Sequence, residues 1–343
     1  MGGKALPTPT RRIGADEYHL ISRKVQETVA DVAGADARTV RAYRNKPSFG
    51  DLDLLLARDG WAADGEDGTL AELMRLFRSR ASFREKNSNI ISMEYRGSDD
   101  DAEGFQVDII LTPPELMDTA DDYFAYNGLG NLIGKLARTL GLKYGFNGLI
   151  LPHDVAGFPH PPVTLTTRTQ NVHRLLGLDH DRFAQGFDEL RDLFDFVAGS
   201  PMFRPAAYAP DASTNHQRHR DRKNATYLAF LDYCDGHPAS HLEPLTKGYP
   251  MDTVRAHFPD VLNTLEAHRR ANERQAALAE WFNGNTISEW TGLKGKELGE
   301  MIRAIRNEAG GDETLMEWGE DTVREVAERL AGQRRRPSPN PGP

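Results

Sequence analysis

The chain has 343 residues, with 42 Lys and Arg against 51 Asp and Glu, which gives a formal net charge of −9 at pH 7. Its 39% hydrophobic and 27% charged residues are typical of a globular protein, and its length allows two modest domains. The single cysteine, Cys234, excludes a disulfide framework and a site built from several thiolates. No apolar run is long enough to span a bilayer, and the amino terminus lacks a signal-peptide core, so we expect a cytoplasmic protein with no membrane partner.

The first half of the chain alternates predicted helices and strands. Residues 1–15 are expected to be flexible, because their start is rich in Pro and Thr. Apolar spacings of three and four predict helices, and alternation predicts strands. The predicted elements are a helix at 16–33, strands at 39–43 and 51–57, a helix at 70–77, strands at 90–95 and 105–111, a helix at 129–140 and a strand at 148–151. We therefore predict a mixed β/α domain over residues 16–155.

A loop rich in Gly and Pro at 153–162 separates this domain from a region whose pattern is helical throughout. The predicted helices lie at 169–176, 188–197, 225–234, 252–282, 298–307 and 321–330. They divide into a thumb-like segment at 163–210 and a C-terminal domain at 211–332, followed by a disordered tail at 333–343. The predicted fold class is α+β, with a mixed β-sheet that has helices on one face, and then an all-helical C-terminal region.

Two aspartates lie two residues apart at the start of a predicted strand, in the run Gly-Asp-Leu-Asp-Leu. Alternate strand residues share a face, so Asp51 and Asp53 point to one side while Leu52 and Leu54 point into the core. The preceding Gly50 relieves crowding and lets a phosphate approach the backbone. The alternative interpretation is a pair of surface residues on an edge strand.

A third aspartate, Asp108, lies within the apolar strand predicted at 105–111. Three carboxylates at adjacent strand ends repel one another unless cations lie between them. Hard oxygen ligands suit Mg²⁺, with Mn²⁺ as an alternative, and two such ions can activate an acceptor hydroxyl and stabilise a leaving pyrophosphate. We therefore expect Asp51, Asp53 and Asp108 to be catalytic and to bind two Mg²⁺ ions.

The sequence around these aspartates resembles a known family. Residues 43–53, Tyr-Arg-Asn-Lys-Pro-Ser-Phe-Gly-Asp-Leu-Asp, are similar to the palm motif of the DNA polymerase β (family X) nucleotidyltransferases, and Val-Asp-Ile at 107–109 resembles the segment with its third metal-binding carboxylate. The Tyr-Phe pair at 123–124 and the run at 164–178 resemble further family segments. The resemblance covers residues 35–187 and implies a nucleotidyltransferase palm, with an NTP or dNTP as substrate.

The resemblance also implies roles for single residues. Asp108 would be nearest the attacking hydroxyl, and basic residues would neutralise the triphosphate. The Gly-Ser that begins the family's phosphate-binding helix is replaced here by Val40-Arg41, so charge would supply these contacts instead. The Thr-Gly-Ser that follows the family's Tyr-Phe pair is also absent. The expected nucleotide-binding residues are Arg41, Arg44, Lys46, Ser48, Gly50 and Asn131.

Two later segments are candidates for nucleic-acid binding. Residues 282–299 resemble a segment of bacterial tRNA nucleotidyltransferases and poly(A) polymerases, with Lys294 where those enzymes have Pro; a plain helix-turn-helix packing motif is the alternative. The densest basic run, at 216–223, could bind a nucleic-acid backbone or form a solvated helix face. The nucleic-acid contacts expected in that run are Arg218, Arg220, Arg222 and Lys223.

These features predict a metal-dependent nucleotidyltransferase. It would transfer a nucleoside monophosphate from an NTP or dNTP to an acceptor hydroxyl and release pyrophosphate. The expected acceptor is a nucleic-acid 3′ end, in DNA or tRNA-like RNA. Two alternatives stay open, which are a protein or small-molecule acceptor and a non-catalytic nucleic-acid-binding module.

Overall fold

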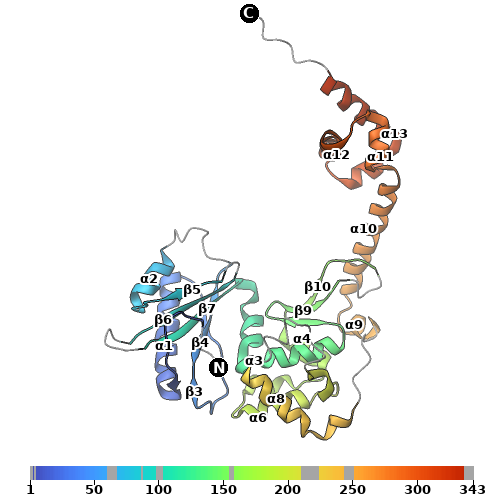
Figure 1. Ribbon diagram of the computed structural model, residues 1–343. Helices are drawn as coiled ribbons and strands as arrows, with labels where there is room; N and C mark the ends of the chain where they lie inside the picture. The colour runs from blue at the N-terminus through green and yellow to red at the C-terminus, as the bar shows by residue number, and fades with distance from the viewer. Residues whose placement is uncertain are drawn as a thin grey trace, which may run out of the picture. The chain divides into compact units, whose positions relative to one another are not determined.

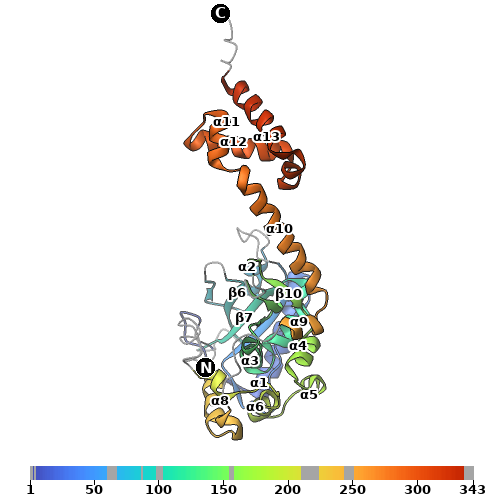
Figure 2. The same cartoon turned by 90° about the vertical axis from the view of Figure 1, so that its right-hand side faces the viewer.

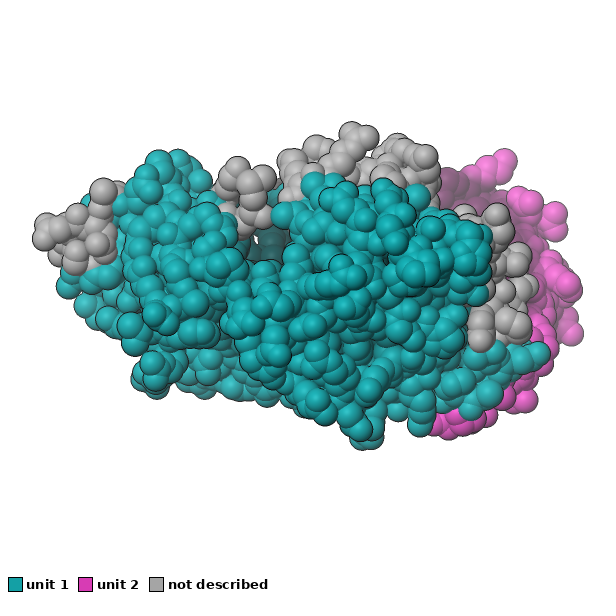
Figure 3. All heavy atoms as spheres, turned by 90° about the horizontal axis from the view of Figure 1, so that it is seen from below, with its two compact units in different colours: residues 1–155, 162–258 teal, residues 156–161, 259–343 magenta. Residues whose placement is uncertain are grey.

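The computed structural model describes residue 3 and residues 5–59, 68–85, 88–97, 103–153, 158–209, 224–242 and 251–335. The chain forms two compact units (Figures 1 and 3). Unit 1 comprises residues 1–155 and 162–258, and unit 2 comprises residues 156–161 and 259–343. In the described part of the chain, no helix is long and apolar enough to cross a membrane.

A five-stranded mixed sheet forms the first part of unit 1. Its strands lie in the order β2 (Ala37–Thr39), β4 (Asp51–Ala57), β7 (Phe105–Thr112), β6 (Ile90–Tyr95) and β5 (Ser82–Phe83). The pair β4–β7 is parallel and the other pairs are antiparallel, so the predicted mixed sheet is confirmed. The first predicted strand, at 39–43, is displaced, since β2 ends where that strand was expected to begin.

One face of this sheet is covered by α1 (Ala15–Ala33) and α2 (Thr69–Leu76), as Figures 1 and 2 show. Alternate residues of the two central strands point into that layer and are fully or almost fully buried: Leu52, Leu54, Leu56, Val107, Ile109 and Leu111. Each buried side chain of this size contributes about 1.5–3 kcal/mol. The predicted arrangement of helices on one face is confirmed here. The other face carries the aspartates, and its far end packs against the start of α3 (Met117–Thr139) through Leu55 and Ile110.

The amino-terminal segment lies along the sheet, although its composition predicts a flexible chain. The Ala5 amide donates to Oε1 of Gln106 at 2.9 Å, and the Arg11 amide donates to the Gly104 carbonyl at 2.9 Å. Leu6 is buried, and β1 (Ile13–Gly14) pairs with β3 (Ser48–Phe49). Pro and Thr do not oppose such an arrangement, because the segment uses backbone groups to bond to partners that are distant in sequence.

The second part of unit 1 begins with a short 3₁₀ helix, η1 (Pro114–Leu116), and α3. A three-stranded antiparallel sheet follows in the order β10 (Val163–Thr166), β9 (Gly148–Leu151) and β8 (Lys143–Gly145). The prediction of helices alone beyond residue 162 is therefore wrong at β10. Four residues are too few to show a strand period, and the strand is stabilised by pairing with β9.

The rest of unit 1 is helical and packs around aromatic side chains. Its elements are α4 (Thr169–Leu176), α5 (His180–Gln185), α6 (Leu190–Ala198), η2 (Pro205–Tyr208), α8 (Ala225–Asp235), η4 (Pro238–His241) and α9 (Met251–His257). Phe183, Phe187 and Phe196 are buried with ring centroids 5.3–6.5 Å apart. The side chain of Asn224 caps α8 by accepting a hydrogen bond from the Tyr227 amide.

The described part of unit 2 contains four helices, α10 (Val261–Trp281), α11 (Gly284–Thr291), α12 (Gly295–Ala309) and α13 (Asp312–Arg335). Their core includes Ile287, Met301 and Ile305, which are fully buried. Asn283 caps α11, and Gly292 ends it in a left-handed conformation. The helix, turn and helix expected over residues 282–299 are therefore confirmed as structure.

Candidate active site

The candidate site lies on the open face of β4 and β7. The parallel register places Asp53 beside Asp108 and Asp51 beside Gln106, so these four side chains share one face. The aspartates are half-buried, whereas the intervening leucines and valine are buried on the opposite face. Strand alternation therefore separates a charged face from an apolar one.

Two of the aspartates accept hydrogen bonds from neighbouring groups. The Gln106 amide nitrogen donates to both carboxylate oxygens of Asp108, at 3.0 and 2.9 Å, and the Gly3 backbone amide donates to Asp51 Oδ2 at 3.1 Å. Because Gln106 also accepts from Ala5, it connects the amino-terminal segment to Asp108. Sequence reasoning missed Gln106, although its place two residues before Asp108 on the same strand is a usable signal.

Burial and the charges of neighbouring carboxylates raise the pKa of Asp53 and of Asp108 above the ordinary value for aspartate. Burial and the neighbouring charges of Asp51 and Asp108 raise the pKa of Asp53 strongly. Burial raises the pKa of Asp108 to about 6, against the lowering effect of hydrogen bonds from Ser92 and Gln106. A cation placed between the carboxylates would relieve the repulsion, so the charge distribution of this face favours cation binding.

The donor chemistry of this face fits Mg²⁺. The residues present carboxylate oxygens, which are the hard ligands that Mg²⁺ prefers. Among the described residues, however, no three acidic, histidine or cysteine side chains lie close enough to hold a metal ion together as they stand. Both oxygens of Asp108 accept a hydrogen bond from Gln106, and each oxygen keeps a further lone pair that could bind a metal ion.

Lys46 is the cation most closely associated with the aspartates. Its ammonium group donates to Asn127 Oδ1 at 3.1 Å and lies 4.3 Å from the centroid of the Phe49 ring. Burial lowers the pKa of Lys46, while the charges of Asp51 and Asp53 oppose that shift. A lysine in this position supplies a positive charge beside the carboxylates.

The predicted phosphate contacts Arg41 and Arg44 have protein partners. Arg41 forms an ion pair with Asp122 at 2.6 Å and stacks over Tyr126 at 5.3 Å. Arg44 forms an ion pair with Asp188 at 2.6 Å and donates to the Gln185 carbonyl. The structure therefore brings Arg41 to the rim of the site, whereas the side chain of Arg44 binds the segment between α5 and α6.

The remaining predicted residues lie in different surroundings. Both the hydroxyl and the carbonyl of Ser48 accept hydrogen bonds from Arg12 at 3.1 Å, and Gly50 is buried. Asn131 accepts a hydrogen bond from the Tyr123 hydroxyl at 3.1 Å. The predicted nucleic-acid contacts lie outside the described residues, and they are Arg218, Arg220, Arg222 and Lys223.

A left-handed turn interrupts α3 beside the site. Tyr126 (φ 58°, ψ 52°) and Asn127 (φ 58°, ψ 39°) adopt left-handed conformations, and Gly128 continues the turn at φ 85°. Each non-glycine residue in such a conformation costs about 1–3 kcal/mol, and strain of this kind is frequent at functional sites. The Tyr126 amide donates to the Arg41 carbonyl at 2.7 Å, which helps to hold the turn. The turn also places Oδ1 of Asn127 where it accepts a hydrogen bond from Lys46.

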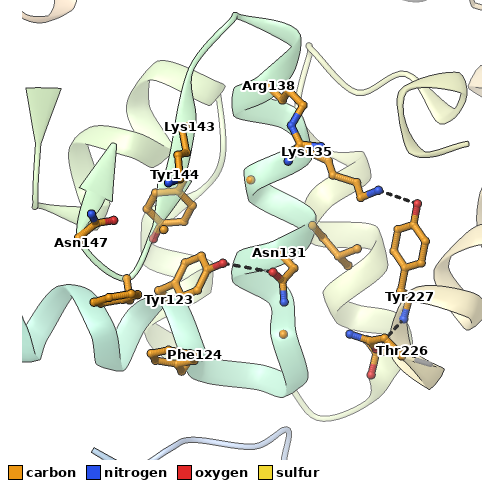
Figure 4. Close-up of a pocket in the computed structure, with 16 residues that line it drawn as sticks. Tyr123, Phe124, Asn131, Lys135, Arg138, Lys143, Tyr144, Asn147, Thr226 and Tyr227 are labelled. Carbon is orange, nitrogen blue, oxygen red and sulfur yellow. Dashed lines mark hydrogen bonds between the residues drawn. The ribbon is translucent and has the colours of Figure 1, made fainter. Parts of the chain in front are cut away.

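Two adjoining pockets open beside the aspartates. The smaller, of about 220 Å³, is lined by Asp51, Asp53, Lys46 and Asn127 together with residues of α3. The larger, of about 470 Å³, lies between α3, β8 and the start of α8, and Figure 4 shows the side chains that line it. Figure 3 shows a recess in the surface of unit 1. Both pockets share the lining residues Tyr123, Phe124, Gly128, Asn131 and Asn224.

Comparisons with known proteins were made for the whole chain. No family model matches the sequence, and no curated protein matches it. Among solved structures, the crystal structure of Leishmania infantum polymerase beta in a ternary P/T complex is similar, with a TM-score of 0.38 and 19% identity over 49% of this chain and 74% of that chain. A likeness at this level establishes neither a family nor an activity, so the function has to be argued from the site itself.

Proposed function

We propose that this chain is a metal-dependent nucleotidyltransferase. In the proposed reaction, an acceptor hydroxyl oxygen forms a bond to the α-phosphorus of an NTP or dNTP. The bond between that phosphorus and the oxygen bridging to the β-phosphate breaks, pyrophosphate leaves, and the hydroxyl proton passes to solvent. The proposed acceptor is the 3′ end of a nucleic acid.

The observation that carries the proposal is the set of carboxylates on one face of two parallel strands. Asp51, Asp53 and Asp108 lie half-buried on this face, and burial, together with the charges of neighbouring carboxylates, raises the pKa of Asp53 and of Asp108. Titratable groups perturbed in this way, beside a pocket, are typical of functional sites. Asp51, Asp53 and Asp108 would hold Mg²⁺, which when bound would neutralise phosphate charge and polarise the acceptor hydroxyl.

The pocket geometry favours binding of the nucleotide and of the acceptor hydroxyl on opposite sides of the three aspartates. Asp51 and Asp53 line the smaller pocket, together with Lys46, whereas Asp108 does not. The Lys46 ammonium can therefore bind phosphate oxygens of a nucleotide seated there. The acceptor hydroxyl would approach from the side of Asp108, and the carboxylate would orient it toward the phosphate.

The proposal is tested by transfer of α-labelled NTPs and dNTPs in Mg²⁺ or Mn²⁺ to single-stranded, primed and tRNA-like acceptors. Asp108→Asn should lower the rate roughly 10³-fold or more, which corresponds to about 4 kcal/mol of transition-state stabilisation. Asp118→Asn is the matched control, since Asp118 lies in the first turn of α3 with a side chain that is 93% exposed. Loss of transfer in both variants, or in neither, would contradict the assignment.

The acceptor is a separate part of the proposal. If the chain binds nucleotide in Mg²⁺ but extends none of the polynucleotides, transfer to a protein or a small molecule becomes the favoured function. Failure of the folded protein to bind any nucleotide would overturn the enzyme proposal and leave the non-catalytic alternative.

A further inference from the structure

Two asparagine side chains converge where the two pockets join. Asn131 lies on α3, and Asn224 is the N-cap of α8, 93 residues later in the sequence. A Cβ atom built on Gly128 would lie 3.4 Å from Asn131 Nδ2 and 3.9 Å from Asn224 Nδ2. Both amide nitrogens therefore face the space that Gly128 leaves open.

The oxygen atom of each amide accepts a hydrogen bond, and the backbone donor of Tyr227 fixes the orientation of the Asn224 amide. Oδ1 of Asn131 accepts from the Tyr123 hydroxyl at 3.1 Å, and Oδ1 of Asn224 accepts from the Tyr227 amide at 3.1 Å. Within the described part of the chain, no acceptor is recorded for either Nδ2 group. Two amide N–H groups at the mouth of a pocket are suited to a ligand that presents hydrogen-bond acceptors.

The surrounding pocket has the size and the side chains that suit a nucleoside. Its volume of about 470 Å³ falls within the usual range for small-molecule sites. The rings of Tyr123 and Tyr144 lie 5.4 Å apart at 77°, and Lys135 donates to the Tyr227 hydroxyl at 2.7 Å across the pocket wall (Figure 4). Aromatic faces stack with any base, so they favour binding without selecting among bases.

We propose that Asn224 binds the nucleoside part of the nucleotide whose phosphates bind at Asp51 and Asp53, beside Asn131, for which the resemblance already implies a nucleotide contact. Their N–H groups would donate to acceptor atoms of the base, such as O2 of a pyrimidine or N3 of a purine, or to an oxygen of the sugar. The inference rests on the proposed function. It adds that α8, which lies beyond the segment that resembles polymerases, supplies half of the nucleoside site.

This arrangement has a consequence for how the nucleotide is bound. Both donors belong to the protein, so neither contact requires a template base. The chain should therefore bind nucleotides before any acceptor is present. Guanine should bind less well than the other bases if the contact is to the base, because its N2 amine is a donor beside N3.

The test is calorimetric titration of the full chain with each of the four NTPs, their 2′-deoxy forms and ribose 5′-triphosphate, in Mg²⁺ and without acceptor. Asn224→Ser removes the amide but keeps an N-cap of comparable strength. It should weaken nucleotide binding roughly 5- to 10-fold, which is the usual effect of one lost hydrogen bond. Asn283→Ser is the matched control, because Asn283 caps α11 in unit 2 with the same kind of side-chain hydrogen bond.

Each outcome decides the inference. Equal affinities for Asn224→Ser and Asn283→Ser would overturn it and leave the proposed function intact, whereas no binding by the unaltered chain would overturn the proposed function. If Asn224→Ser melts earlier than Asn283→Ser, Asn224→Asp replaces it, since Asp caps equally well and presents only acceptors. That variant should bind more weakly than the unaltered chain, and unchanged binding would overturn the inference. If Asn224→Ser weakens the binding of ribose 5′-triphosphate as much as the binding of the NTPs, the contact is to the sugar and not to the base.

Discussion

Two groups of ionisable side chains in unit 1 have pKa values that shift in opposite directions. On the sheet, Asp53 and Asp108 lie beside a pocket and a lysine, and burial raises their pKa values. On α4, His173 lies fully buried among phenylalanine rings, and burial and the nearby His180 lower its pKa to about 3. In both places the neutral form of the side chain is favoured.

The surroundings distinguish the two clusters. The His173 ring contacts the Phe183 ring at 4.8 Å and the Phe196 ring at 5.7 Å, so it serves as a neutral aromatic side chain in the core. Its Nδ1 lies 3.1 Å from Nδ1 of His180. The aspartates instead face one another across two strands, and only a cation or protons can relieve their repulsion. A perturbed pKa therefore marks a candidate site only where a pocket and complementary charge accompany it.

The largest expected effect comes from Asp53→Asn. The substitution should lower nucleotidyl transfer roughly 10³-fold, about 4 kcal/mol, because one charged metal ligand is lost. It should also raise the free energy of unfolding by about 1–3 kcal/mol in EDTA, because an asparagine avoids the cost of protonating or burying a carboxylate beside two others. Urea unfolding with and without Mg²⁺ measures the second effect.

Mg²⁺ supplies the internal control for this variant. The ion should stabilise the unaltered chain, because a ligand that binds the native state shifts the unfolding equilibrium, and should stabilise Asp53→Asn much less. If Asp53→Asn is less stable in EDTA than the unaltered chain, Asp53 is a structural carboxylate and the contrast between the two clusters fails.

The next effect concerns pH and His173. The native pKa of about 3 lies below the value of about 6.5 for an unfolded histidine, so the unfolded state binds the proton more readily below pH 6.5. The contribution of His173 to stability is complete above pH 6.5 and is lost as the pH falls toward 3. It amounts to about 2 kcal/mol between pH 7 and 5, at about 1.4 kcal/mol for each pH unit below 6.5.

His173→Phe isolates this contribution, because it keeps a planar ring in the aromatic cluster. Unfolding in urea from pH 7 to 5 should show a flatter profile for His173→Phe than for the unaltered chain. The same substitution at the exposed His241 should leave the slope unchanged. Identical slopes in all three proteins would show that His173 is protonated in the native state.

The sequence allowed some of these features to be predicted and concealed others. The alternation of polar and apolar residues along 51–57 and 105–111 was enough to assign the two faces of the sheet. Each side chain in these strands lies either on the face that packs against the helices or on the open face. The contact of Asn224 with the pocket could not be predicted, since it depends on the path of the chain after α3. The left-handed turn at 125–128 was also missed, because tertiary contacts such as Lys46 to Asn127 stabilise it.

The smallest expected effect comes from substitutions of Gln106, which test how Asp108 is held in the carboxylate cluster. Gln106 donates to Asp108 and accepts from Ala5, so it is a positioning residue for both. Gln106→Met removes both contacts, whereas Gln106→Glu keeps an acceptor for Ala5 and loses the donor. Each variant should be less stable by about 1 kcal/mol. Because the Gln106 hydrogen bond lowers the pKa of Asp108, both variants should also raise the pH needed for half-saturation with Mg²⁺.

Hydrogen exchange at the Ala5 amide separates the two contacts of Gln106. Protection should be lost in Gln106→Met and retained in Gln106→Glu, whereas the shift in Mg²⁺ saturation should be larger in Gln106→Glu, since a fourth carboxylate adds repulsion. A purely structural role for Gln106 would change stability without moving the pH dependence of Mg²⁺ binding. Such a result would assign Gln106 to the amino-terminal segment alone and leave Asp108 to be oriented by Ser92, the other side chain that donates to it.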